Sequence, residues 1–416
     1  MENKVNNRIK SNNEYAVLKK ELTEIARKEI MLKGYDIDDV SAFSEIERLV
    51  FESESVSMLT IAKLRQMIQE IFFSIRSEYD ILTPYINDET VTEIMVNGFD
   101  NIFIERNGSI EKLDVVFDSV ETLEEVIRRI AAKVHREVNE RSPILDARLS
   151  NGARVNAVYK NIALDGPVLS IRKFPRAALD MNSLVGNKTI SEEAADFLKM
   201  LVRAGYNIFV SGGTSSGKTT FLNVLSEFIP KGNRVVVIED SAELQLRGIE
   251  NLVRLECRNA NIQGVGEVSM DMLIRNSLRM RPDWIVVGEI RGKECISMLQ
   301  AMNTGHYSMS TGHANSIEGM LERMEAMCLQ SGDVPSDSVR HQIARGIDLI
   351  VHLGRINGVG RKVLEIAEIQ GFENNNYIIN TIFKYKINKG LVFTGNSLIN
   401  NEKLELAGCS YDGDRL

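Results

Sequence analysis

The amino-acid sequence predicts a carboxyl-terminal α/β domain with a mostly parallel sheet, preceded by an α+β domain and a helical amino-terminal extension. Three observations predict this order. Residues 14–78 contain no proline and repeat apolar residues at three- and four-residue steps. Residues 79–172 contain short alternating strands separated by glycine-containing turns. After Met181, strands alternate with helices, as expected of a three-layer domain with a largely parallel sheet.

The composition limits the classes of protein to which the chain can belong. The chain has 416 residues, 44% apolar and 26% charged, which excludes wholesale disorder and fits two or three domains. A formal net charge of −8 argues against direct binding of nucleic acid or anionic lipid. The cysteines form no C-x-x-C pair, so reduced thiols are expected rather than a zinc site or a disulfide framework. No secretory signal and no apolar run of about 20 residues is visible, which predicts an intracellular protein.

The helical extension is predicted to cover residues 1–78. A small helical bundle and an amphipathic arm both fit its apolar pattern. The α+β domain follows at residues 79–174. Asn107-Gly108 is its strongest hairpin signal, because both residues tolerate positive φ. Its predicted strands are residues 91–96, 102–106, 109–113, 146–149 and 153–156, and its predicted helix is residues 120–138.

A linker is predicted at residues 175–181, the α/β domain at residues 182–400 and a tail at residues 401–416. Ser191 is a predicted helix cap, followed by two glutamates in the first turn, where the helix dipole favours them. Two of the predicted strands are continuous apolar runs, as expected of strands covered on both faces. The predicted strands of this domain are residues 207–210, 234–238 and 283–287.

One segment carries the clearest chemistry, because Gly212, Gly217, Lys218 and Thr219 fit the pattern G-x-x-x-x-G-K-[ST] of a phosphate loop. Glycines let consecutive N–H groups curl around an anion, and the following helix directs its positive end at the same phosphates. An apolar strand precedes the loop and an amphipathic helix follows it, which argues against a chance glycine-rich turn. The segment predicts binding of ATP with Mg²⁺. The candidate binding residues are Gly212, Gly213, Thr214, Ser215, Ser216, Gly217, Lys218, Thr219 and Thr220.

Acidic residues follow the two apolar strands. Glu289 comes directly after residues 283–287, the position of a Walker B carboxylate, and Glu239, Asp240 and Glu243 follow residues 234–238. Any one of them could be a solvated loop acid. Together with a phosphate loop, they are candidates for holding Mg²⁺ and activating water.

Two of the five histidines, His306 and His313, lie in a stretch rich in Gly, Ser and Thr. We expect this stretch to be a polar loop that senses or contacts phosphate. A metal site is a weaker interpretation, since no acid or cysteine lies near them in the sequence. Arg148 and Arg154 flank the second hairpin of the α+β domain. A three-residue loop places them opposite each other on one face, where an anion would relieve their repulsion; a two-residue turn places them on opposite faces as solvated side chains.

Four segments occur in one order: GGTSSGKTT, IEDSAEL, LRMRPDWIVVGEIRG and MNTGHYSMSTGHANS. With VTEIMVNGFDNIFIERNG and RSPILDARLSNGARVNAV upstream, the chain resembles the type II/IV secretion-system ATPase family. Within it, the chain is most similar to the tight-adherence (Flp-type) pilus assembly ATPases, the CpaF-like group. The stretch STGHANS departs from the commoner TT-x-HAN pattern. Residues after Gly354 depart further, and residues 357–361 are expected to be weakly constrained.

The resemblance implies a P-loop (RecA-like) ATPase domain and a role for each candidate. Lys218 and Thr219 would hold phosphates and Mg²⁺, Glu289 would be the Walker B acid, and Glu243 would activate water. Glu239 and Asp240 would support the metal, His313 (or His306) would sense the γ-phosphate, and Arg148 with Arg154 would clamp the nucleotide.

It further implies a cytoplasmic homo-hexamer that contacts the membrane only through inner-membrane platform proteins. The predicted function is an ATPase motor for pilus assembly or protein secretion. A conjugation or DNA-uptake motor is the first alternative, and a nucleotide-gated scaffold with little hydrolysis is the second.

Overall fold

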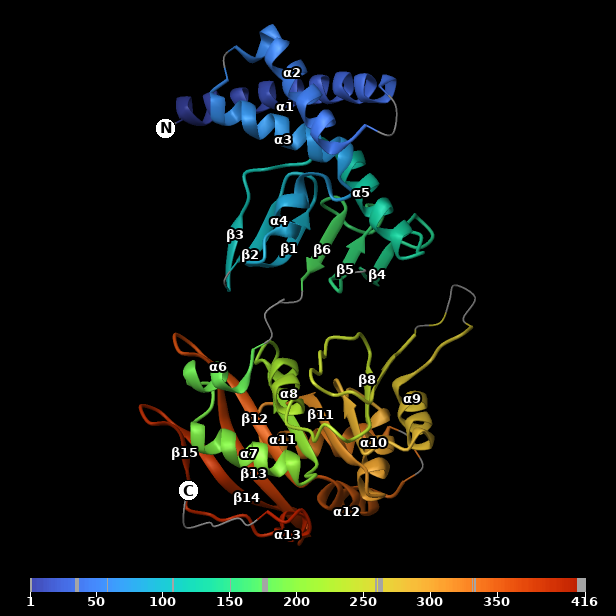
Figure 1. The fold of residues 1–416 in the computed structure, drawn as a ribbon, viewed down its shortest axis with the longest axis vertical. Coiled ribbons are helices and arrows are strands. Elements are labelled where there is room, and N and C mark those ends of the chain that lie inside the picture. Colours follow the sequence, from blue (N-terminus) through green and yellow to red (C-terminus); the bar gives the residue numbers. More distant parts are fainter. Residues whose placement is uncertain are drawn as a thin grey trace. The chain divides into compact units, whose positions relative to one another are not determined.

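The computed structural model describes residues 2–33, 37–57, 59–106, 108–149, 151–173, 179–258, 260, 265–330, 332 and 334–409, with side chains at Tyr15 and from Val17 onward (Figure 1). The chain divides into two compact units, Met1–Ala177 and Ala178–Leu416. Asn107, Ser150, linker residues 175–178 and tail residues 410–416 lie outside the described residues. In the described part of the chain, no helix combines the length and apolar composition needed to cross a bilayer.

The amino-terminal unit begins with a helical bundle. Its helices enclose a shared apolar core in which Ile46, Met67 and Ile71 are fully buried. Asp38 caps the second helix by accepting hydrogen bonds from two backbone N–H groups, and Thr60 caps the third. The structure therefore has a bundle here, one of the two arrangements that the apolar pattern allowed. The elements are α1 (Glu2–Leu32), α2 (Asp39–Glu52), η1 (Glu54–Val56) and α3 (Ile61–Arg76).

The same unit contains an antiparallel six-stranded sheet of order β3-β2-β1-β6-β5-β4. Helix α5 packs Val126, Ile127 and Ile130 against one face of this sheet. Side chains on the other face are polar or only partly buried. The elements are η2 (Asp80–Leu82), α4 (Thr83–Asn87), β1 (Val91–Asn97), β2 (Ile102–Arg106), β3 (Ser109–Lys112), α5 (Val120–Lys133), β4 (Ile144–Arg148), β5 (Arg154–Val158) and β6 (Val168–Arg172).

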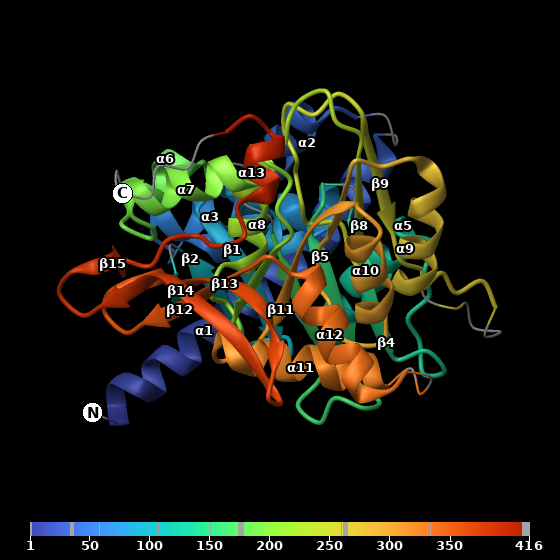
Figure 2. The same ribbon diagram turned by 90° about the horizontal axis from the view of Figure 1, so that it is seen from below.

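The carboxyl-terminal unit is built on a nine-stranded sheet of order β15-β14-β13-β12-β7-β11-β10-β8-β9 (Figures 1 and 2). Neighbouring strands from β12 to β9 are parallel, and β13, β14 and β15 add antiparallel strands at one edge. The strands are β7 (Ile208–Gly212), β8 (Val235–Glu239), β9 (Leu252–Glu256), β10 (Trp284–Val287), β11 (Tyr307–His313), β12 (Leu349–Ile356), β13 (Gly360–Glu373), β14 (Asn376–Lys386) and β15 (Gly390–Phe393).

Helices cover both faces of this sheet, and alternate strand residues enter two cores. Ile208 and Val210 belong to the core beneath α7 and α8, whereas Phe209 belongs to the core beneath α10, α11 and α12. Ser191 caps α7, as predicted, by accepting a hydrogen bond from the N–H of Ala194. The helices are α6 (Met181–Gly186), α7 (Glu192–Arg203), α8 (Lys218–Ser226), α9 (Met270–Ser277), η3 (Leu278–Met280), α10 (Glu294–Asn303), α11 (Ile317–Leu329), α12 (Ser336–Gly346) and α13 (Glu402–Leu406).

The prediction of a polar loop around the histidines is wrong for residues 307–313, which form the central strand β11. Its small polar side chains are buried because backbone carbonyl groups accept hydrogen bonds from them. The Ser308 hydroxyl donates to the carbonyl of His306 at 3.2 Å, and the Thr311 hydroxyl donates to the carbonyl of Gly288 at 2.8 Å. Ser308, Ser310 and Thr311 are at most 1% exposed.

Candidate nucleotide-binding site

The phosphate loop runs from the end of β7 to the start of α8, and two glycines fix its path. A Cβ atom at Gly212 would lie 2.5 Å from the carbonyl oxygen of Leu353 on the adjacent strand β12, too close for any side chain. Gly217 precedes the helix at φ +94°, in the left-handed region that favours glycine. Among the residues that the structure describes, no side chain caps α8, so its first N–H groups are left for another acceptor, as in an anion site.

Lys218 is the first residue of α8, and its side chain is 6% exposed. Its Nζ donates to the carbonyl oxygens of Gly212 and Gly213 at 3.1 and 2.9 Å. Burial lowers the pKa of this amine, and the negative charge of Glu289 partly offsets the shift. The ammonium group is therefore held within the loop that would surround a phosphate.

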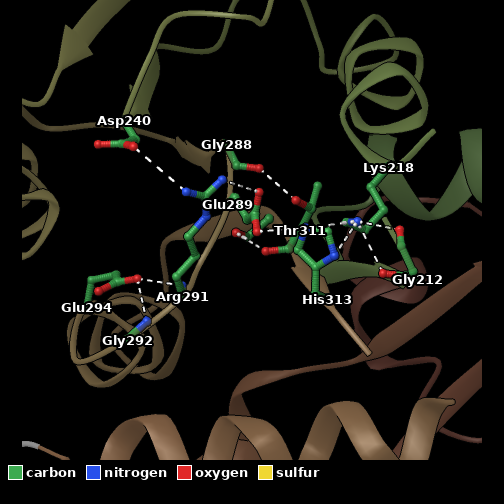
Figure 3. A network of polar contacts seen from close by, with 12 residues as sticks. Gly212, Lys218, Asp240, Gly288, Glu289, Arg291, Gly292, Glu294, Thr311 and His313 are labelled. Atoms are coloured by element: carbon green, nitrogen blue, oxygen red, sulfur yellow. Dashed lines mark hydrogen bonds and ion pairs between the residues drawn. The ribbon is translucent and has the colours of Figure 1, made fainter. Parts of the chain in front are cut away.

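His313 links this lysine to Glu289 (Figure 3). The last residue of β11 pairs in register with Gly212, which places the imidazole beside the phosphate loop. Nδ1 lies 3.3 Å from Nζ of Lys218, and Nε2 lies 3.2 Å from Oε1 of Glu289. Burial lowers the pKa of His313 and so does the Lys218 charge, which favours a neutral ring. A neutral ring can accept a hydrogen bond from Lys218 at Nδ1, whereas Oε1 of Glu289 lies close to Nε2 but has no hydrogen-bond partner among the described residues.

Glu289 also contacts Arg291, a residue that the sequence reading did not select (Figure 3). Nη2 of Arg291 lies 3.1 Å from Oε2 of Glu289, and Nη1 lies 4.0 Å from Oδ2 of Asp240. The carboxylate of Glu294 accepts from the N–H groups of Arg291 and Gly292 and so fixes the turn before α10. A positive side chain thus joins the acids that follow β8 and β10, where parallel strands end at one edge of the sheet.

Glu239 holds the loop that follows β8 through hydrogen bonds to its backbone. Its side chain is 3% exposed, and Oε1 accepts hydrogen bonds from the N–H groups of Glu243 and Leu244 at 2.7 and 2.8 Å. Burial raises the pKa of this carboxyl group to about 7, although the two N–H donors oppose the shift. Glu239 therefore anchors the loop that carries Glu243, and a metal-binding role for it remains a prediction.

The amino-terminal unit brings Arg148 and Arg154 together. Leu149 and Ala153 bracket a three-residue loop through a 2.9 Å hydrogen bond, and Arg148 pairs directly with Arg154. Arg154 pairs in turn with Arg172 on β6. We call Arg148, Arg154 and Arg172 the arginine row. Of the two loop lengths considered, the structure has the one that places the arginines on one face, and it adds a third arginine.

The structure thus brings Lys218, Glu289 and His313 into contact, whereas His306 precedes β11 at the end of the strand opposite from His313. Thr219 and Thr220 lie in the first turn of α8. No cluster of three or more His, Cys, Asp or Glu side chains suited to a metal ion occurs among the described residues.

Three arginines were missed for different reasons. Arg291 lies two residues after Glu289 and could have been selected from that spacing. Arg172 could have been found from the alternation of side chains along the strand that became β6, which places Arg172 on the same face as Arg154. Arg361 gave no local signal: it belongs to the segment expected to be weakly constrained, yet its Nε donates to the carbonyl of Ser215 in the phosphate loop at 3.0 Å.

Comparison with known proteins agrees with this geometry. The sequence model of the family described as "Type II/IV secretion system protein" matches residues 76–369. The conjugal transfer protein TrbB of Rhizobium radiobacter is 33% identical over 306 residues, which are 72% of this chain and 90% of TrbB. The type IV secretion system protein PtlH of Bordetella pertussis is 31% identical over 312 residues, which are 68% of this chain and 92% of PtlH.

A solved structure shares the fold. The pilus retraction motor PilT with bound ADP matches with a TM-score of 0.51 and 20% identity over 73% of this chain and 82% of that chain. The prediction of a P-loop (RecA-like) α/β fold with a mostly parallel sheet is confirmed.

Proposed function

The chain belongs to the type II/IV secretion system protein family, and on this premise we propose that it is a Mg²⁺-dependent ATPase motor of a secretion or pilus-assembly machine. One observation carries the proposal. Lys218 on the phosphate loop, His313 on β11 and Glu289 after β10 form one chain of polar contacts beside the uncapped start of α8. This arrangement places a cation for phosphates, a neutral imidazole and a carboxylate together at the carboxyl-terminal ends of the parallel strands.

We assign the binding of ATP to the phosphate loop. Its N–H groups and the positive end of α8 would surround the β- and γ-phosphates, with Lys218 neutralising their charge. Thr219 and Glu289 would hold the Mg²⁺ that ATP brings, and that ion would stabilise charge on the phosphates. The lowered pKa of Lys218 follows from burial; bound phosphate would favour its charged form.

Hydrolysis requires a water molecule in line with the γ-phosphate, and we propose that Glu243 orients and deprotonates it. Glu239 contributes by fixing the backbone of Glu243. His313 would couple the presence of the γ-phosphate to the position of Glu289, because it contacts both Lys218 and Glu289. The arginine row would supply positive charge to the developing negative charge on the phosphates.

The finer assignments rest on the resemblance. We propose a cytoplasmic homo-hexamer that acts on inner-membrane platform proteins and powers assembly of a tight-adherence (Flp-type) pilus. A specific observation favours a second candidate, a conjugation motor, because TrbB is a conjugal transfer protein. The formal net charge of −8 speaks against direct DNA binding in either case. Tight sequence-independent DNA binding by the purified protein would favour the conjugation motor.

The test is the ATPase rate with Mg²⁺ at increasing protein concentration, with the oligomer sized in the same samples. We expect specific activity to rise steeply as rings form, because a motor of this kind completes its sites on assembly. Full activity from a monomer would overturn the ring motor.

A variant pair separates a motor from a nucleotide-gated scaffold. Glu289→Gln should lower turnover at least about a hundredfold while ATP binding persists, since the carboxylate acts on the reaction rather than on the loop. Glu322→Gln, an exposed position on α11, is the control and should behave as wild type. A wild-type protein that binds ATP and assembles without turnover would identify the scaffold.

A further inference from the structure

The hairpin formed by β12 and β13 runs past the end of the strand that carries the phosphate loop. The pairing of β12 with β7 ends at Leu353 and Gly212, where β7 becomes the loop. Beyond that point β12 continues to Ile356, and β13 returns from Gly360. The outer part of this hairpin therefore flanks the phosphate loop instead of another strand.

Two arginines occupy one cross-strand position of this outer hairpin. Arg355 on β12 pairs with Arg361 on β13, so both side chains lie on the same face. Both residues are exposed. Their side chains differ in their contacts: Nε of Arg361 donates to the carbonyl of Ser215, whereas among the described residues the side chain of Arg355 makes no hydrogen bond or ion pair.

The hydrogen bond from Arg361 is made to Ser215, the residue of the phosphate loop with a strained backbone conformation. Ser215 has φ +58°, a left-handed conformation that a residue with a Cβ adopts only when its surroundings hold it. The donor comes from a charged group, which makes the bond stronger than one between neutral partners. Arg361 also packs on Gly217 of the loop, since a Cβ at Gly217 would lie 3.3 Å from Cδ of Arg361.

We propose that Arg361 is a positioning residue for nucleotide binding. By donating to the carbonyl of Ser215, it holds the phosphate loop in the conformation whose N–H groups receive phosphate, and it couples that conformation to the β12–β13 hairpin. The inference rests on the proposed function, because it assigns a role at the same phosphate site. Arg361 acts through the loop, and its Nε–H is the group that matters.

Side-chain chemistry allows a sharp test. The amide nitrogen of glutamine occupies the position of arginine Nε, so Arg361→Gln removes the charge and keeps a donor for Ser215. Methionine reaches as far as the position of Nε, like glutamine, and has no donor, so Arg361→Met removes the hydrogen bond. Arg355→Met is the matched control, because it makes the same change at the paired position on the same face.

The measurement is the Kd for ADP by titration calorimetry on the full chain, together with KM and kcat for ATP. We expect Arg361→Met to raise the Kd for ADP and the KM for ATP about tenfold, the effect of losing one charge-assisted hydrogen bond, with kcat changed less. Arg361→Gln should stay within about threefold of wild type, and Arg355→Met should match wild type. The melting temperature without nucleotide should be unchanged in all three, because both positions are exposed.

Each other result decides against the proposal. Equal Kd values for Arg361→Met and Arg355→Met would show that the hydrogen bond has no effect on the loop. An Arg361→Gln variant as weak as Arg361→Met would show that charge, and not the Nε–H donor, is needed. If wild type binds no ADP and Lys218→Ala changes nothing, the proposed function itself fails; if wild type binds and Arg361→Met binds equally, only this inference fails.

Discussion

The two sheets of this protein place their charged residues in different ways. The parallel part of the nine-stranded sheet is covered by helices on both faces, and every residue of β8 and β10 is buried. The six-stranded sheet is covered on one face, and β5 alternates buried residues with more exposed ones. Charge in β7, β8, β10 and β11 is therefore confined to the strand ends, where Glu239, Glu289 and His313 lie. In the second sheet it lies along an open face as the arginine row.

This difference predicts unequal tolerance to truncation. Ile285 on β10 is fully buried, and Ile285→Ala should lower the free energy of unfolding by about 3–4 kcal/mol through lost burial and a cavity. Asn156 on the open face of β5 is exposed, and Asn156→Ala should change it by less than about 0.5 kcal/mol. Urea unfolding followed by the fluorescence of Trp284, the only tryptophan in the sequence, reports the sheet that contains Ile285. If Ile285→Ala lowers the free energy of unfolding by less than about 1 kcal/mol, that result would contradict the burial of β10 on both faces of the sheet.

The two units can also be compared at their buried carboxyl groups, because each unit has at least one whose pKa is raised. Burial and the nearby Asp118 raise the pKa of Asp80 in the amino-terminal unit to about 6, and burial raises that of Glu239 to about 7. The folded state then binds a proton that the unfolded state has released, so stability falls as pH rises. For Asp80 this pH window runs from the ordinary pKa of 3.8 to about 6, and for Glu239 from 4.5 to about 7.

Glu239→Gln tests this directly, since the amide oxygen can still accept from Glu243 and Leu244. At pH 8 the variant should gain up to about 3 kcal/mol of stability, and its stability should depend less on pH between 5 and 7. Trp284 fluorescence in urea at several pH values gives both quantities. Glu256→Gln, at the register partner of Glu239 on β9, controls for the loss of one carboxylate. A Glu239→Gln variant with the wild-type pH profile would show that this carboxyl group does not titrate in the window.

A structural feature of this protein could be predicted from the sequence when a short, continuous segment determines it. The phosphate loop and the strands before Glu239 and Glu289 follow from short patterns, and they are found where predicted. β11 was missed because its buried serines and threonine resemble a loop; in the folded sheet their hydroxyl groups donate to backbone carbonyl groups. Turn length left the position of Arg148 and Arg154 open, and the strand register decides it.

The contact of Arg361 with the phosphate loop could not be predicted from the sequence at all. The two partners are 146 residues apart, and they meet because β12 lies beside β7 in the sheet. No local pattern gives that sheet order, which includes crossover connections and an antiparallel edge. Functional residues supplied by distant strands are therefore the ones that sequence reasoning misses here.

The arginine row gives the smallest expected effect and the most direct test of why the open face is charged. Arg154 lies in the middle of the row, and Arg154→Gln should lower kcat about ten- to thirtyfold, because Arg148 and Arg172 retain part of the positive charge. The Kd for ADP and the melting temperature should change little, since the loop that binds phosphate and the apolar core are both intact. Asn156→Ala, two residues along the same face, is the control for ATPase measurements. If Arg154→Gln keeps the wild-type kcat, the arginine row does not contribute to the reaction.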